Sequence, residues 1–147
     1  MTFAYVFLAI VLSQILAWAY FTAQRLNRLH IRVDLALHSL GAALDRRAAL
    51  AQALVAPAAD AAVAAQSVPV TPENFDERAQ RERVLWEKLS GVEHPLLIDA
   101  TARVELAHRF YNEAVSATRS LRTRPMVQFC HLGGTARLPE YFELRYT

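Results

Sequence analysis

The segment Phe3–Ala23, FAYVFLAIVLSQILAWAYFTA, decides the architecture of this chain. It contains no charged side chain. As an α-helix rising about 1.5 Å per residue it would reach roughly 31 Å, the thickness of a bilayer's hydrocarbon core. Ser13 and Gln14 are the only clearly polar residues near its centre, and Trp18 and Tyr20 near its far end suit a membrane interface. Residues 1–24 are therefore predicted to form a transmembrane helix with a short external N-terminus.

Charged residues first appear directly after this segment. All 16 lysines and arginines and all 14 aspartates and glutamates lie at or after Arg25. Arg25, Arg28 and Arg32 follow the span with no acidic residue between them, and we expect them to contact the head groups of membrane lipid. The positive-inside rule then predicts that the N-terminus is outside and that the rest of the chain is cytoplasmic.

A cleaved signal peptide is the alternative interpretation of the same segment. Ala17-Trp18-Ala19 has the spacing of small residues that signal peptidases accept, and cleavage there would release a secreted helical protein. Signal peptides begin with a basic region, however, and the first residues of this chain contain no lysine or arginine. We therefore favour a retained span.

An apolar stripe predicts that the helix continues far beyond the membrane. Its members step by three and four: Leu26, Leu29, Val33, Leu37, Leu40 and Leu44, with Ala51 and Leu54 further on. One helix is predicted from the bilayer through about Ala56, with Arg46 and Arg47 on or beside its polar side. Prolines and alanines then predict a hinge near residues 57–72.

Two further helices are predicted after this hinge. The first begins after Thr71, whose hydroxyl is the expected cap, and runs to about Ser90 with Gly91 as the stop. Its apolar face is predicted from Phe75, Ala79, Trp86 and Leu89, whereas Glu82, Arg83 and Glu87 are expected on a solvated face.

The second has the most regular pattern in the chain. It steps by four and three through Ala100, Val104, Ala107, Tyr111, Ala114, Thr118 and Leu121, and it is closed by Arg122, Arg124 and Pro125. The predicted fold class is all-α: an N-terminal transmembrane helix continuing into a long antiparallel helical bundle over residues 25–147. The tail from Met126 to Leu144 is expected to cover the end of the bundle.

The sequence contains no recognisable catalytic or metal-binding motif, so no cofactor, metal or small-molecule substrate is predicted. Cys130 is the single cysteine, and the five histidines have no metal-ligand spacing. A hydrolase-type enzyme remains an alternative, because the helix around Glu82 and Glu87 superficially resembles that of Nudix hydrolases. Cys130 beside His131 is expected to be inert. Nucleic-acid binding is not predicted, because beyond Val33 arginines alternate with nearly as many carboxylates.

The stretch Thr101–Val115, TARVELAHRFYNEAV, resembles the most recognisable segment of LemA family proteins, a pattern of ile/val-x-x-ala-arg-x-x-tyr-asn-x-x-val. His108 stands where that pattern has its arginine, and Arg109 follows it. The residues carrying the likeness are Arg46, Arg47, Val104, Ala107, Arg109, Tyr111, Asn112 and Val115. Ala49–Leu54 replaces the asp-leu-ile-pro-asn-leu run of the family, and the middle between Ala65 and Glu73 is shorter than expected for it, so the resemblance is to a divergent, shortened member.

The resemblance implies one N-terminal membrane helix, a helical bundle outside the bilayer and no established enzymatic activity. Arg109 is expected to pair with Glu105 or Glu113, one turn away on either side. Together with the span, this predicts a single-pass membrane-anchored scaffold or interaction protein. Besides membrane lipid, the expected partner is another protein or a second copy of the chain, bound through helices.

Overall fold

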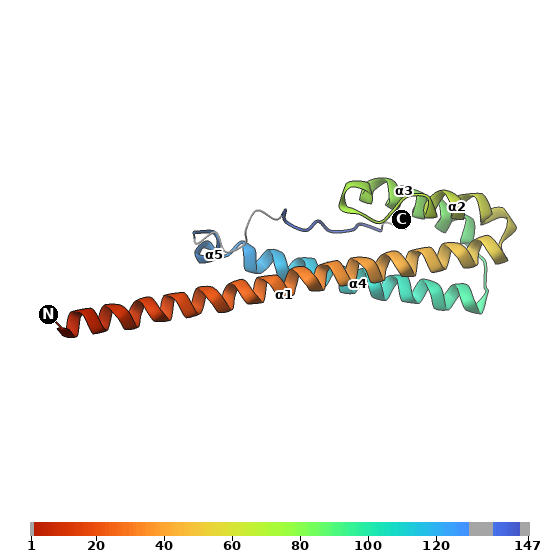
Figure 1. Ribbon diagram of the computed structural model, residues 1–147. Coiled ribbons are helices and arrows are strands. Elements are labelled where there is room, and N and C mark those ends of the chain that lie inside the picture. Colours follow the sequence, from red (N-terminus) through yellow and green to blue (C-terminus); the bar gives the residue numbers. More distant parts are fainter. Residues whose placement is uncertain (1, 130–136, 145–147) are drawn as a thin grey trace.

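The computed structural model describes residues 2–129 and 137–144, and every regular element in these ranges is helical. Figure 1 shows one long helix whose N-terminal part extends alone, with the remaining elements lying beside the rest of its length. The elements are α1 (Thr2–Leu54), the 3-10 turn η1 (Ala56–Ala58), α2 (Ala59–Gln66), the 3-10 turn η2 (Pro72–Asn74), α3 (Phe75–Leu89), α4 (Pro95–Arg122) and α5 (Pro125–Phe129). The prediction of an all-α chain is confirmed for this part of the molecule.

Helix α1 is continuous over 53 residues, as the unbroken stripe predicts. Its N-terminal part extends away from the rest of the molecule (Figure 1), and its apolar side chains there are exposed, Phe3 at 91% and Phe21 at 70%. Among the described residues, α1 is the one helix long and apolar enough to cross a membrane, and none of its most apolar window is buried within the protein.

The second half of α1 packs against α4, which runs in the opposite direction beside it (Figure 1). All of the residues in the predicted α4 pattern are buried: Ala100, Val104, Ala107, Tyr111, Ala114, Thr118 and Leu121. Leu40 and Leu44 of α1 meet Val104 and Ala114 in one apolar cluster, and Leu26 meets Leu121 nearer the span. Small residues alternate with large ones on α4, which lets the two helices approach closely.

Helices α2 and α3 fold back over the far end of α1. Val55 adopts an extended backbone conformation and Pro57 follows it, which ends α1 and starts η1. Within the predicted hinge, α2 is helical and buries Ala62 and Ala65 against α1 and α3. Gly91, at φ +82°, terminates α3 in the left-handed conformation that glycine tolerates best.

The predicted start of α3 is partly wrong. Thr71 is extended before Pro72, but its hydroxyl makes no capping hydrogen bond. Its carbonyl oxygen accepts from the Asn74 backbone N–H at 2.9 Å, which closes η2, and the α-helix begins only at Phe75. A backbone turn therefore takes the place of the expected hydroxyl cap.

The last described segment, residues 137–144, is irregular and lies along α4. Phe142 is fully buried in the cluster formed by α1, α3 and α4. The tail was expected to cover the end of the bundle, whereas residues 137–144 lie along the side of α4. Cys130 and His131 lie outside the described residues.

Candidate functional site

The arginines predicted to contact lipid are exposed on α1 directly after its uncharged stretch. Arg25, Arg28 and Arg32 all have solvent-accessible side chains. Arg46, two turns beyond the pocket described below, is also exposed and lies beside Phe110 in a shallow groove between α1 and α4.

Arg47 corrects the predicted polar side of α1. It is fully buried, and its Nη2 donates to Oε2 of Glu82 on α3 at 2.8 Å. Its guanidinium also lies 5.8 Å from the centre of the Trp86 ring. The arginine is inside because it continues the stripe of Leu40 and Leu44 by a step of three.

Glu82 is likewise buried, where a solvated face was expected. Besides Arg47, it accepts from Nε of Arg78 at 2.9 Å. Arg78 is 1% exposed and also donates to the Val68 carbonyl and to Asp45, both at 2.7 Å. Burying a charge is favourable only when its hydrogen bonds are satisfied. Here two arginines and two carboxylates join α1, α3 and the 67–71 connection. We call these four residues the charge cluster: Asp45, Arg47, Arg78 and Glu82.

The tyrosine and asparagine of the family-like motif hold the C-terminal segment. The Tyr111 hydroxyl donates to the Glu140 carbonyl at 2.6 Å. Asn112 makes a reciprocal pair with the backbone of Phe142: its Nδ2 donates to the carbonyl at 3.3 Å, and its Oδ1 accepts from the N–H at 3.2 Å. Nε2 of His108, at the position where the family pattern has arginine, lies 2.6 Å from the same carbonyl.

Two more residues of α4 extend this arrangement along the segment. Nη1 of Arg119 donates to the Pro139 carbonyl and Nη1 of Arg122 to the Arg137 carbonyl, each at 3.0 Å. We call the set His108, Tyr111, Asn112, Arg119 and Arg122 the tail clamp. Nearly all of the hydrogen bonds of the tail clamp are to backbone atoms of the segment. The clamp therefore depends on the backbone path of the segment more than on its side chains.

Phe142 supplies the apolar anchor of the clamped segment. Its ring makes edge-to-face contacts with Phe75, whose centre is 5.1 Å away, and with the His108 ring at 6.2 Å. Phe75 in turn lies 6.0 Å from Tyr111. Such pairs are favoured by the ring quadrupoles, and they place α3, α4 and the tail around one aromatic centre.

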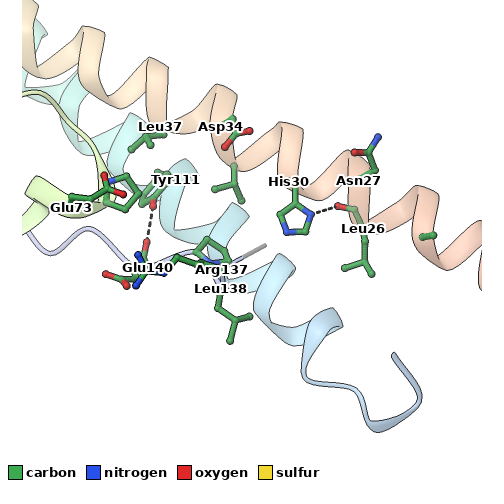
Figure 2. Close-up of a pocket in the computed structure, with 14 residues that line it drawn as sticks. Leu26, Asn27, His30, Asp34, Leu37, Glu73, Tyr111, Arg137, Leu138 and Glu140 are labelled. Atoms are coloured by element: carbon green, nitrogen blue, oxygen red, sulfur yellow. Dashed lines mark hydrogen bonds between the residues drawn. The ribbon is translucent and has the colours of Figure 1, made fainter. Parts of the chain in front are cut away.

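The clamped segment forms one wall of a pocket of about 610 Å³ whose other walls are α1, Tyr111 and the start of η2 (Figure 2). It is lined by Ala23, Leu26, Asn27, His30, Val33, Asp34, Leu37, Pro72, Glu73, Tyr111, Arg137, Leu138, Pro139 and Glu140. Its volume is in the range of small-molecule sites. It begins on α1 where the uncharged stretch ends, and we call it the juxtamembrane pocket.

Carboxylates dominate the charge of the juxtamembrane pocket. Asp34, Glu73 and Glu140 line it together with a single arginine, Arg137. Burial, and after it the negative charges of Glu140 and Asp34, together raise the pKa of Tyr111 to about 12. The tyrosine hydroxyl therefore lies in a negative potential.

His30 of α1 also lines the pocket. Its Nδ1 lies 2.9 Å from the Leu26 carbonyl, and because a carbonyl oxygen only accepts, Nδ1 carries the proton. Nε2 is buried and has no hydrogen-bond partner among the residues that the structure describes. Figure 2 shows the ring extending from α1 toward α4 and the tail.

The other motif residues have packing or surface positions. Val104, Ala107 and Val115 are buried on α4. Arg109 is exposed and pairs with Glu113 at 3.0 Å, one of the two partners expected for it. Within residues 2–129 and 137–144, no group of three or more histidine, cysteine, aspartate or glutamate side chains is placed to hold a metal ion.

The charge cluster and the pocket were missed by the sequence analysis, although the first left a signal. Phe75, Arg78, Glu82, Leu85 and Leu89 are the buried residues of α3, and they step by three and four. Two charged residues on an otherwise apolar stripe indicate buried ion pairs. The pocket left no such signal, because it depends on where the tail folds.

Comparisons of the chain with models of protein families, with curated proteins and with solved structures found no match.

Proposed function

We propose that this chain is a single-pass membrane-anchored helical interaction protein of LemA-like type. The observation that carries the proposal is the exposed N-terminal part of α1, whose most apolar window is not buried by any of the described elements. Apolar surface on this scale is unfavourable in water and favourable in lipid. The same helix continues without a break into the packed helices, so the anchor and the body form one piece.

The proposed orientation has the N-terminus outside and the helical bundle in the cytoplasm. Arg25, Arg28 and Arg32 support it, because they are exposed on the body side of the span and are free to meet anionic head groups. Each contributes about 1 kcal/mol at such a surface.

An exposed apolar face supports a role in binding other helices. Leu106 and Phe110 of α4 are each more than half exposed, and Ile31 and Leu35 of α1 are exposed as well. Leu106 and Phe110 line the shallow groove between the two helices, which is about 350 Å³ in volume. A partner helix or a second copy of the chain that docks there would bury these side chains.

The LemA-like assignment rests on the motif residues of α4 and on the proposed topology. The hydrolase alternative gains no support from Glu82, because both of its carboxylate oxygens accept from arginines. The proposed role is therefore binding.

Carbonate extraction and protease treatment test the anchoring. Membranes from cells that produce the full chain are washed in alkaline carbonate, and intact cells are treated with protease. We expect the protein to stay in the pellet and its C-terminal part to be digested only after the cells are opened. Release by carbonate would contradict the anchor, and digestion in intact cells would reverse the orientation.

Cross-linking in the membrane tests the binding face. We expect Phe110→Ser to abolish most of the cross-linked product formed by the native chain, because it removes an exposed apolar contact. Tyr141→Ser is the matched control, since Tyr141 is a similarly exposed aromatic residue on the tail. Equal cross-linking by both variants would exclude the α1–α4 face as the binding surface.

A further inference from the structure

The residues of α1 that line the juxtamembrane pocket fix its distance from the proposed span. Its α1 wall runs from Ala23 to Leu37, about 21 Å at 1.5 Å per residue. Ala23 is the last residue of the uncharged stretch, so the lower end of the pocket meets the membrane surface if the helix is inserted as proposed. A membrane lipid can then enter the pocket without leaving the bilayer.

The pocket combines apolar and charged groups, which are the two kinds of surface that an amphiphilic lipid would contact. Ala23 and Leu26 on α1 give its membrane end an apolar wall. Asp34 lies two to three turns further along the same helix, and Glu73 and Glu140 line the pocket from η2 and the tail. Apolar contact thus begins nearest the bilayer, and carboxylates follow further from it.

The charge of the pocket favours a cationic group over an anionic one. Asp34, Glu73 and Glu140 form no ion pair with any residue in the described part of the chain, and only Arg137 among the lining residues is always positive. A purely anionic head group would meet three carboxylates and only one arginine.

A primary ammonium group would supply hydrogen-bond donors to the carboxylates that line the pocket. Such a group offers three N–H donors, which match three carboxylates, whereas a trimethylammonium offers none. Arg137 supplies the complementary charge for a phosphate on the same head group.

We propose that the juxtamembrane pocket binds the head group of a phospholipid that carries both a primary amine and a phosphate, as ethanolamine phospholipids do. The ammonium lies among Asp34, Glu73 and Glu140, and the acyl chains remain toward Ala23 and the bilayer. This inference rests on the proposed membrane anchoring, because it takes the ligand from the bilayer.

Native mass spectrometry of the full-length protein in mild detergent tests this inference. The protein is offered equal amounts of phosphatidylethanolamine, phosphatidylcholine and phosphatidylglycerol. We expect about tenfold greater retention of phosphatidylethanolamine than of either competitor, the value of one charge-assisted hydrogen bond. Equal retention of the three lipids, or preferential retention of phosphatidylglycerol, would overturn the proposal.

A matched pair of triple variants separates the pocket from the general surface. Asp34→Asn with Glu73→Gln and Glu140→Gln removes the pocket carboxylates, and we expect it to lose the preference. Asp60→Asn with Glu87→Gln and Glu105→Gln makes the same change of charge at exposed positions outside this pocket, and we expect it to keep the preference. Circular dichroism checks that both variants are folded. A pocket variant that is folded and keeps the preference would overturn the proposal.

Free phosphoethanolamine distinguishes a lipid from a soluble ligand. If it binds while the lipid is not retained, the site does not take its ligand from the bilayer and the proposal fails. Carbonate extraction of the same membranes tests the anchor separately. A protein that resists extraction but shows no lipid preference therefore refutes the pocket assignment and leaves the proposed anchoring intact.

Discussion

Two polar sites hold this molecule together in different ways. The charge cluster buries Arg47, Arg78 and Glu82 almost completely and ties α3 to α1. The tail clamp uses mainly neutral side chains at its centre, and it binds backbone atoms of a segment near the C-terminus. The first site contains charges that only their partners can satisfy, whereas water can replace most of the bonds in the second. The comparison implies that losing the first unfolds the body and losing the second releases only the tail.

Glu82→Gln is expected to have the largest effect. It removes the carboxylate that accepts from both Arg47 and Arg78 in the protein interior, which costs about 3–5 kcal/mol in free energy of unfolding. Chemical denaturation followed by circular dichroism measures it. Glu87→Gln on the exposed side of the same helix is the control, with an expected change below about 0.5 kcal/mol. Equal stability of the two variants would show that the charge cluster does not hold the body together.

Phe142→Ala is expected to have the second-largest effect. It should lower the free energy of unfolding by about 3 kcal/mol, because it removes an aromatic side chain from a packed site. In contrast to Glu82→Gln, we expect its effect to be local. Hydrogen exchange should rise in residues 137–144 while α1 and α4 keep their protection. Loss of protection in α4 as well would mean that the tail and the helices unfold as one unit, and the distinction between the two sites would fail.

Asn112→Ala should cost about 1–2 kcal/mol, because it removes both bonds to the Phe142 backbone. The expected result is again faster exchange of the tail amides, with a smaller change than for Phe142→Ala. Gln52→Ala is a suitable control, since Gln52 is an exposed amide residue of α1 outside the juxtamembrane pocket. An unchanged tail in Asn112→Ala would mean that His108 and Phe142 are sufficient to hold it.

Tyr111→Phe should have the smallest effect, about 1 kcal/mol at neutral pH for the lost bond to the Glu140 carbonyl. It also has a distinct pH dependence. Because the pKa of the folded tyrosine is raised to about 12 from the ordinary 10.0, the stabilisation is complete below pH 10.0 and is lost as pH rises through about 12.

The tyrosinate absorbance and the unfolding free energy, measured across this pH range, test that dependence. In the native chain one of the 5 tyrosines should ionise late. Tyr111→Phe should lack that late step. If the variant and the native chain lose stability in parallel between pH 10.0 and 12, the buried hydroxyl is not the cause.

Periodicity predicts the helices of this chain well because their faces are apolar. Every predicted position on α4 from Ala100 to Leu121 is buried, and α1 has its predicted continuity. The same reasoning misplaced Arg47 and Glu82, since charged residues are normally solvated. Their pairing joins positions 35 apart in the sequence, and no local pattern reports such a contact.

The candidate site was less accessible to sequence reasoning. Tyr111 and Asn112 stood out in the family-like motif, but their bonds to Glu140 and Phe142 join segments that only the fold brings together. The histidines have no metal-ligand spacing in the sequence, and only the fold shows that His30 lines the juxtamembrane pocket. Long-range placement decides such sites, and hydropathy and spacing carry no information on it.

The unbroken course of α1 has a mechanical consequence. At about 1.5 Å per residue its 53 residues form a rod about 80 Å long, with no joint between the bilayer and the packed helices. Any tilt or rotation of the span is therefore transmitted to α4 as a rigid motion. If α1 is inserted in a bilayer as proposed, a neighbour that twists the helix within the lipid would reorient the whole body, which could not swing freely about its anchor.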